Sequence, residues 1–167
     1  RDVLFFSSLS LSLISLSLSP IDTRSALNRR RQIDCPCGGT PTLCDFECAL
    51  CQASVNRFGS VQVLCNNAGV FTGGHLWEQT EDDYEWLIRV NQWGIINGLR
   101  HFVPQMIAQG DECHIVNTSS MASICTLPFA GIYHMTKHAV LAMSESLFHE
   151  LAFHVPNVKV SVLCPEM

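Results

Sequence analysis

The sequence predicts an α/β fold in which helices flank a parallel sheet, and three observations lead to this prediction. Short apolar runs at 61–65, 113–118 and 158–163 have the length and composition of buried strands. Longer patterns with helical spacing separate these runs at 81–108 and 132–154. Strands that alternate with helices in this way imply right-handed crossovers and a parallel sheet.

Local signals mark where the two long helices begin and end. Thr80 is a suitable N-cap, and acidic residues follow it in the first turn, where they oppose the helix dipole. Gly110 is expected to end the first helix, and Pro156 follows the second. The apolar positions expected to face the core are Trp86, Leu87, Val90, Trp93, Ile96 and Ile107, then Ala139, Val140, Met143, Leu147 and Leu151.

Composition and charge exclude several classes of protein. The chain has 167 residues, 47% of them hydrophobic, which suffices for one domain with a core. The net charge is −5 and the one basic cluster is Arg29–Arg31, so we expect no nucleic-acid partner. The sequence has no run of about 18 apolar residues, so we expect no membrane span.

The nine cysteines are odd in number and irregular in spacing, which does not indicate a framework of disulfides. We expect reduced thiols and therefore a cytoplasmic protein. A zinc site built from Cys35, Cys37, Cys48 and Cys51 is the alternative. His134 and His138 are four residues apart, and we expect packed or solvated roles for them rather than metal binding.

The first 19 residues differ in character from the rest of the chain. Ser and Leu alternate through 7–19, a low-complexity composition that we do not assign to the core. A signal peptide, a transit peptide and an irregular segment all remain open for 1–19. Residues 20–167 are expected to form a single domain.

Chemically useful side chains follow the predicted strands. The turn that begins at Asn66, Ser120 and Pro165 would all lie at one edge of the sheet, where parallel sheets bind ligands. Tyr133 and Lys137 are four residues apart and would share one face of a helix. An ammonium beside a phenol favours the phenolate, which suits proton exchange with a carbonyl or an alcohol. Alone, such a pair is more often simply a pair of residues on a helix surface.

Four motifs in order resemble the short-chain dehydrogenase/reductase family. They are the turn Asn66-Asn67-Ala68-Gly69, Asn91 in Val-Asn-x-x-Gly, Ser120 after Ile-Val-Asn-x-Ser, and Tyr133-x-x-x-Lys137. The resemblance extends from about Asp45 to Pro165 and implies a Rossmann-like domain that binds NAD or NADP.

The resemblance also implies a role for each residue of the motifs. Tyr133 would be the general acid and base, Lys137 would support it and hold the nicotinamide ribose, and Ser120 would bind the substrate oxygen. Asn91 would hold a helix irregularity and a water. The expected cofactor contacts are Asp22, Asp45, Asn66, Ala68, Gly69, Tyr133, Lys137 and Pro165. Asp22 would favour NAD, whereas the neighbouring Arg24 could meet a 2′-phosphate.

The sequence departs from the family pattern at both ends. It has no Gly-x-x-x-Gly-x-Gly loop, and it stops at 165–167, before the segment that closes over nicotinamide and substrate. The domain is therefore expected to be incomplete, without the first strand of the sheet. The helix after Asp45 is also shorter than the family's, which changes the expected adenine pocket.

These observations favour an NAD(P)-dependent oxidoreductase that acts on an alcohol or ketone. An inactive remnant of the family, acting only as a folded or partner-binding unit, is the alternative. The substrate is expected to be apolar, because hydrophobic residues surround the site. The residues concerned are Met121, Ile124, Leu127 and Phe129. The resemblance further implies a homo-oligomer that pairs through 81–108 and 132–154.

Overall fold

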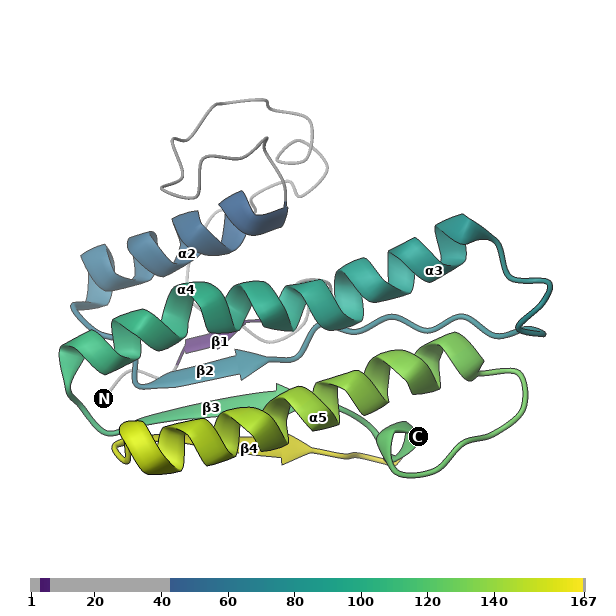
Figure 1. Cartoon of the computed structure of the whole chain (residues 1–167). Coiled ribbons are helices and arrows are strands. Elements are labelled where there is room, and N and C mark those ends of the chain that lie inside the picture. The colour runs from purple at the N-terminus through teal and green to yellow at the C-terminus, as the bar shows by residue number, and fades with distance from the viewer. Residues whose placement is uncertain (1–3, 7–42, 167) are drawn as a thin grey trace.

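One parallel sheet of four strands organises the part of the chain that the computed structural model describes, residues 4–6 and 43–166 (Figure 1). The strands are β1 (Leu4–Phe6), β2 (Val63–Asn66), β3 (Cys113–Thr118) and β4 (Val158–Leu163), and they lie in that order. Every neighbouring pair is parallel. The predicted fold class, a Rossmann-like parallel sheet with flanking helices, is therefore confirmed.

The register brings the carboxyl ends of the strands to one edge. Asn66, the last residue of β2, is opposite Asn117 of β3, and Thr118 is opposite Leu163, the last residue of β4. The peptide after each strand therefore emerges beside the next one, and the segments that carry the family motifs begin there.

The helices follow the predicted order but not every predicted boundary. They are α2 (Leu43–Phe58), α3 (Glu81–Ile88), α4 (Gly94–Gln109) and α5 (Gly131–His154). Thr80 caps α3 in a capping box with Asp83, as its side chain predicts. Gly110 ends α4 with φ of 73°, a left-handed conformation that glycine adopts without strain.

A π-helical turn, η1 (Arg89–Trp93), joins α3 to α4. The sequence predicts one continuous helix here, and the structure interrupts it with a wider turn that holds one extra residue. Trp86 and Trp93, which are expected in the core, are exposed in the structure, and so is Ile107 on α4. The break in helical phase accounts for part of this difference, because a single helical period over 81–108 does not allow for the extra residue.

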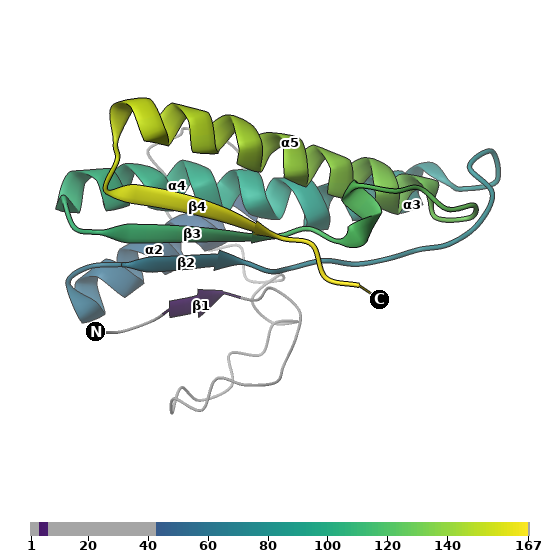
Figure 2. The same cartoon turned by 90° about the horizontal axis from the view of Figure 1, so that it is seen from below.

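The main core lies between the sheet and the helices on one of its faces (Figure 2). It combines residues from α2, α4 and α5 with alternate residues of the strands. Its buried members are Cys51, Val61, Leu64, Phe102, Met106, Cys113, Ile115, Leu151 and Val158. On β3 the residues between these, His114 and Val116, are half-buried on the opposite face.

Two expectations for the N-terminal part of the chain were wrong. Leu43, Cys44 and Asp45 open helix α2 rather than end a strand. A three-residue apolar stretch is too short to distinguish the two. The expected loss of the first strand is also wrong, because Leu4–Phe6 pair in parallel with β2. Residues 7–42 lie outside the described part, and with them lie Asp22, Arg24, Cys35 and Cys37.

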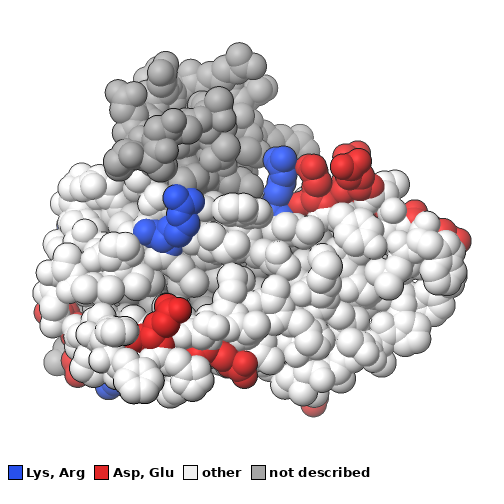
Figure 3. Space-filling model, viewed as in Figure 1, with Lys and Arg blue, Asp and Glu red and all other residues white. Residues whose placement is uncertain are grey.

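Charges on the described surface are sparse. In Figure 3 acidic side chains gather near α3, whose first turn carries Glu81, Asp82 and Asp83, and the basic side chains on this face are few and separate. The absence of a nucleic-acid partner remains a prediction. Within the described residues, no helix combines the length and the apolar character needed to cross a membrane.

Candidate active site

A cavity of about 240 Å³ opens at the carboxyl edge of the sheet. It is bounded by the segments that follow β2, β3 and β4 and by the first turns of α5. Its lining residues are Asn67, Gly69, Val70, Phe71, Thr118, Ser119, Ser120, Tyr133, Lys137, Pro165 and Glu166. Five residues predicted for the site, Gly69, Ser120, Tyr133, Lys137 and Pro165, are therefore brought to one cavity.

Tyr133 and Lys137 lie one turn apart near the start of α5, as their spacing predicts. The Lys137 ammonium lies 5.7 Å from the centroid of the Tyr133 ring. Only 3% of Lys137 is exposed, and its Nζ donates a hydrogen bond to the Thr118 carbonyl at 3.0 Å. Burial lowers the pKa of Lys137, and the nearby Cys164 thiol opposes that shift.

Asn91 lies in the middle of the π-helical turn and is fully buried. Its Oδ1 accepts from the Val70 backbone N–H at 2.8 Å, and its Nδ2 donates to the Val70 carbonyl at 3.0 Å. The same Nδ2 donates to the Thr136 hydroxyl, also at 3.0 Å. Asn91 therefore ties the segment after β2 to the turn of α5 between Tyr133 and Lys137.

Gly69 fits tightly between these two groups. A Cβ at this position would lie 3.3 Å from Lys137 Nζ and 3.7 Å from Asn91 Oδ1. Any side chain here would press on the lysine, so glycine keeps the backbone close to the ammonium.

Ser120 follows β3 and caps the short 3₁₀ turn η2 (Met121–Ser123). Its Oγ accepts from the Ala122 backbone N–H at 3.2 Å, and the residue is buried. Among the described residues its hydroxyl hydrogen has no acceptor, so it is available to a ligand oxygen in the cavity. The Ser119 hydroxyl donates to the Lys137 carbonyl at 2.9 Å and joins the end of β3 to α5.

Asn66 and Ala68, two of the predicted cofactor contacts, are not among the residues that line the cavity. The Asn66 side chain turns into the interior, where its Nδ2 donates to Asn117 Oδ1 at 2.8 Å. Asn117 in turn donates to the Ser144 hydroxyl at 3.0 Å, so these amides join β2, β3 and α5. Asn67, not Asn66, is at the cavity.

Asp45 was expected in the adenine pocket because it would follow a strand. The structure instead places it in the first turn of α2, so this reason no longer applies. Asp22 is outside the described residues. The described residues contain no group of three or more His, Cys, Asp or Glu side chains suited to a metal ion.

Several residues of the site were not predicted. Phe71 meets the Tyr133 ring edge-on, with centroids 5.2 Å apart, and nothing in its sequence context indicates this contact. Thr118 supplies the carbonyl that fixes Lys137. Its place at the end of an apparent strand is a signal that could have identified it.

Two loops interlock beside the cavity. The Gly74 backbone N–H donates to the Phe129 carbonyl at 2.8 Å, and the His75 ring packs between Trp77 and Phe129. Phe129 has φ of 66°, a left-handed conformation that is uncommon for a bulky residue. These contacts join the segment after β2 to the loop before α5, whose side chains Leu127 and Phe129 are exposed.

Comparisons with known proteins agree with this arrangement. The family model for short chain dehydrogenases matches residues 46–167. A 1-deoxy-11-beta-hydroxypentalenate dehydrogenase of Streptomyces exfoliatus is 35% identical over 118 residues, which are 70% of this chain and 42% of that protein.

Solved structures show the same likeness. A short chain dehydrogenase/reductase from Burkholderia phymatum in complex with NAD has a TM-score of 0.73 and 42% identity, covering 74% of this chain and 44% of that one. ElxO with NADP bound has a TM-score of 0.69 and 26% identity, covering 75% and 50%. The chain thus spans half or less of the length of these relatives.

Proposed function

The chain belongs to the short-chain dehydrogenase family, and on that premise we propose that it is an NAD(P)-dependent oxidoreductase that interconverts an alcohol and a ketone. The observation that carries the proposal is the cavity shared by Gly69, Ser120, Tyr133 and Lys137 at the carboxyl edge of the sheet. A proton-exchanging phenol, a cation and a free hydroxyl hydrogen converge there, which is what reduction of a carbonyl requires.

The residues present fit the nicotinamide end of the cofactor. Lys137 uses one of its three N–H donors on Thr118, which leaves two for the hydroxyls of a ribose. Gly69 presents backbone without a side chain next to that ammonium, so a sugar can approach. When bound, the cofactor supplies or accepts the hydride, while the protein orients the reactants and handles the proton.

Tyr133 is the proposed proton donor and acceptor. In reduction its hydroxyl gives a proton to the ketone oxygen, and in oxidation its phenolate takes the proton of the alcohol. The Lys137 ammonium lies on the same side of the helix, 5.7 Å from the centroid of the Tyr133 ring, and places a positive charge beside the group that exchanges the proton. Ser120 donates its free hydroxyl hydrogen to the same substrate oxygen and fixes its position.

Asn91 is proposed to hold the helix irregularity that shapes the site. Its side chain is already engaged with Val70 and Thr136. A water that relays protons to Lys137 would therefore be bound through the Asn91 backbone, which the π-helical turn makes less regular.

NAD and NADP are both proposed as cofactors of this cavity. The Burkholderia phymatum structure contains NAD and the ElxO structure contains NADP. Asn67 and Pro165 line the cavity and are proposed to contact the cofactor, whereas Asn66 supports it from the interior. Equilibrium titration of the protein with each nucleotide shows whether it prefers NAD or NADP.

An apolar ketone or alcohol is the proposed substrate. Beside the cavity, Ile124, Leu127 and Phe129 are each about 60% exposed, and Phe71 is half exposed. Such side chains gain most from a hydrophobic ligand. A series of ketones of increasing chain length should show a falling KM, and an equal or rising KM would contradict the proposal.

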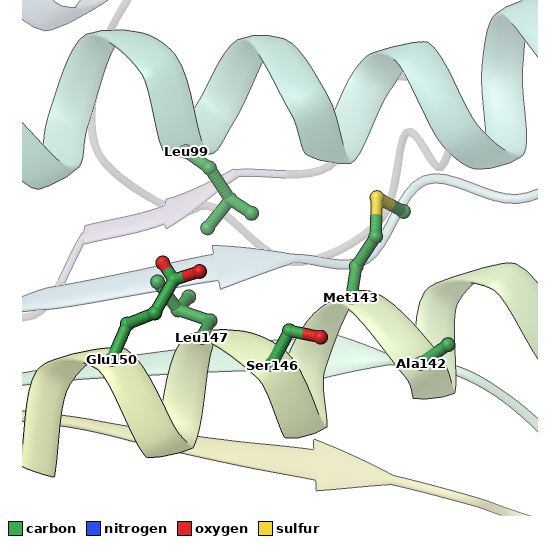
Figure 4. Close-up of a pocket in the computed structure, with 6 residues that line it drawn as sticks. All are labelled: Leu99, Ala142, Met143, Ser146, Leu147 and Glu150. Carbon is green, nitrogen blue, oxygen red and sulfur yellow. The ribbon is translucent and has the colours of Figure 1, made fainter.

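We also propose that two copies pair through α4 and α5. Between these helices lies a groove of about 340 Å³ to which Leu99, Met143 and Leu147 contribute (Figure 4). Trp93 and Phe148 are also exposed on η1 and α5. Burying such apolar side chains favours association. Analytical ultracentrifugation should give a dimer or larger, and a monomer mass at micromolar concentration would oppose the proposal.

A cytoplasmic location is proposed on the state of the thiols. All six cysteines whose state the structure describes are free. Free thiols persist in a reducing compartment. Imaging of the tagged full-length protein tests this, and an extracellular signal would exclude it.

The central test compares the wild-type chain with Tyr133→Phe. Wild type should bind NADH or NADPH, seen as energy transfer from tryptophan, and should reduce an apolar ketone. The variant keeps the ring contact with Phe71 but loses the hydroxyl, so kcat should fall by about 10² to 10⁴-fold with cofactor binding retained. Unchanged turnover would remove Tyr133 from this role, and absence of binding of either nucleotide would reject the function.

A further inference from the structure

His134 joins two parts of the active site without lining the cavity. It follows Tyr133 directly on α5, and only 5% of it is exposed. The Leu127 backbone N–H lies 2.9 Å from its Nε2, and its Nδ1 lies 2.9 Å from the Ala122 carbonyl. Both partners belong to the segment between Ser120 and α5.

These partners define the protonation of the ring. An amide N–H can only donate, so Nε2 accepts and carries no hydrogen. A carbonyl can only accept, so Nδ1 carries the hydrogen and donates it. A proton on both nitrogens would set Nε2–H against the Leu127 N–H. The neutral Nδ1–H form is therefore the one that the geometry specifies.

The two bonds act on different parts of the segment. Ala122 is in η2, the turn that Ser120 caps, and Ser123 also bonds back to the Ser120 carbonyl. Leu127 belongs to the apolar stretch that ends at Phe129. Through one ring, His134 therefore holds the Ser120 turn and the apolar loop on the helix that carries Tyr133.

We propose that His134 is a positioning residue that, as the neutral Nδ1–H imidazole, sets Ser120 and the apolar loop relative to Tyr133. The proposal rests on the function assigned to the cavity above. It concerns how accurately Ser120 and the substrate are placed relative to Tyr133, and His134 itself takes no part in the proton transfer. Displacing reacting groups by about 1 Å can reduce a rate by about 100-fold, so a bond of this kind can control turnover.

Two substitutions separate the two bonds. In His134→Asn the side-chain amide lies where Nδ1 was, which retains a donor for Ala122 and leaves Leu127 without an acceptor. In His134→Gln the carbonyl oxygen reaches toward the Nε2 position, which retains an acceptor for Leu127. His138 provides the matched control, because it is exposed one turn later and its Nδ1 bonds only the His134 carbonyl of its own helix. The controls are His138→Asn and His138→Gln.

Nuclear magnetic resonance of the free chain tests the geometry independently of activity. We expect the His134 nitrogens to show a protonated Nδ1 and an unprotonated Nε2. The Leu127 amide should exchange slowly in wild type and at least about tenfold faster in His134→Asn, and His134→Gln should retain more of this protection. The opposite tautomer, or Leu127 exchange equal in wild type and His134→Asn, would overturn the proposal.

Kinetics then test the consequence. With an apolar ketone, His134→Asn should raise KM about tenfold, because the loop is released, and His134→Gln should lower kcat more than it raises KM, because the Ser120 turn moves. The His138 variants should match wild type. Kinetics of both His134 variants equal to wild type would overturn the positioning role. If wild type shows no turnover but the magnetic resonance results are as expected, the proposed function is rejected. The two hydrogen bonds of His134 to Ala122 and Leu127 are then still supported.

Discussion

The two ends of the sheet both contain fully buried side chains but differ in the chemistry of most of them. Toward the amino ends of the strands, Val61, Phe102 and Met106 have almost no exposed surface and belong to the apolar core cluster. At the carboxyl ends, Asn91, Asn117 and other polar side chains are buried to the same degree. The remaining members of that polar group are Asn66, Ser119, Ser120, Ser123, His134, Thr136, Lys137 and Ser144.

This difference shows what each end contributes. Burying apolar surface stabilises the fold at about 25 cal/mol per Å². A buried polar group adds little net stability even when it is hydrogen-bonded, and leaving it unpaired costs about 1–3 kcal/mol. The carboxyl end therefore holds polar groups in fixed positions for binding and chemistry, while the amino end supplies the stability that this requires.

Lys137→Met should separate the contribution to activity from the contribution to stability most clearly. Activity should fall by at least about 100-fold, because Tyr133 loses its neighbouring charge. Thermal stability should change little at pH 7, because the relief of burying an ammonium offsets the loss of the partner of the Thr118 carbonyl.

The pH dependence of Lys137→Met provides the check. The ordinary pKa of lysine is 10.5, and the pKa of Lys137 in the folded protein is lower. Between these two values the folded wild type binds fewer protons than the unfolded chain. The stability of wild type therefore rises with pH in this range. The variant should lack this rise. A strongly destabilised variant with no pH-dependent difference from wild type would contradict the contrast between the two ends.

Phe102→Ala should have the largest effect on stability at the amino end. The ring is fully buried in the main core, so its loss should reduce the free energy of unfolding by about 3–5 kcal/mol. Phe153→Ala is the matched control, because that ring is exposed, and its effect should stay within about 0.5 kcal/mol. Urea unfolding measures both, and equal effects would show that this core is not packed as described.

Asn91→Leu replaces the amide with an apolar side chain of similar size. The Val70 N–H and carbonyl would lose their partners, so we expect a loss of about 2 kcal/mol and a lower kcat. Asn56→Leu, on the exposed side of α2, should change stability by less than about 0.5 kcal/mol. A neutral or stabilising Asn91→Leu with full activity would remove Asn91 from the site.

Glu47→Gln changes a buried carboxyl outside the active site, and its expected effect on stability is the smallest of these substitutions. Burial raises the pKa of Glu47 to about 6 from 4.5, so the folded state keeps its proton longer than the unfolded chain. Its stabilising contribution is present below pH 4.5 and is lost as pH rises through about 6. The variant should therefore be more stable than wild type by about 1 kcal/mol at pH 7.5, allowing for partial solvent screening.

The melting temperatures of Glu47→Gln and wild type should converge near pH 4. Glu145→Gln, an exposed change on α5, should follow wild type at both pH values. A constant difference across pH would assign the effect of Glu47 to packing instead of ionisation.

The sequence predicted those parts of the fold that depend on local pattern. The strands 113–118 and 158–163 have the predicted bounds, because short apolar runs and the turn residues after each helix identify them. The cavity-lining positions of Ser120, Tyr133 and Lys137 also followed, because strand ends and helical spacing fix where such residues lie.

Features that depend on tertiary contact could not be predicted. The π-helical turn at 89–93 depends on Asn91 bonding a backbone segment 21 positions earlier. The inward turn of Asn66 depends on its partner in β3, and the ring contact of Phe71 on the approach of α5. Strand β1 follows from pairing with β2 rather than from its own composition.

The π-helical turn also limits how this chain can change its length. Such a turn is an α-helix with one residue added, and an α-helix rotates by about 100° per residue. Deleting Gln92 would restore a regular helix, but it would also rotate the faces of α3 and α4 relative to each other by that angle. Either Leu87 would leave the interior or Phe102 would leave the core, so a shorter helix is incompatible with keeping both anchors in place.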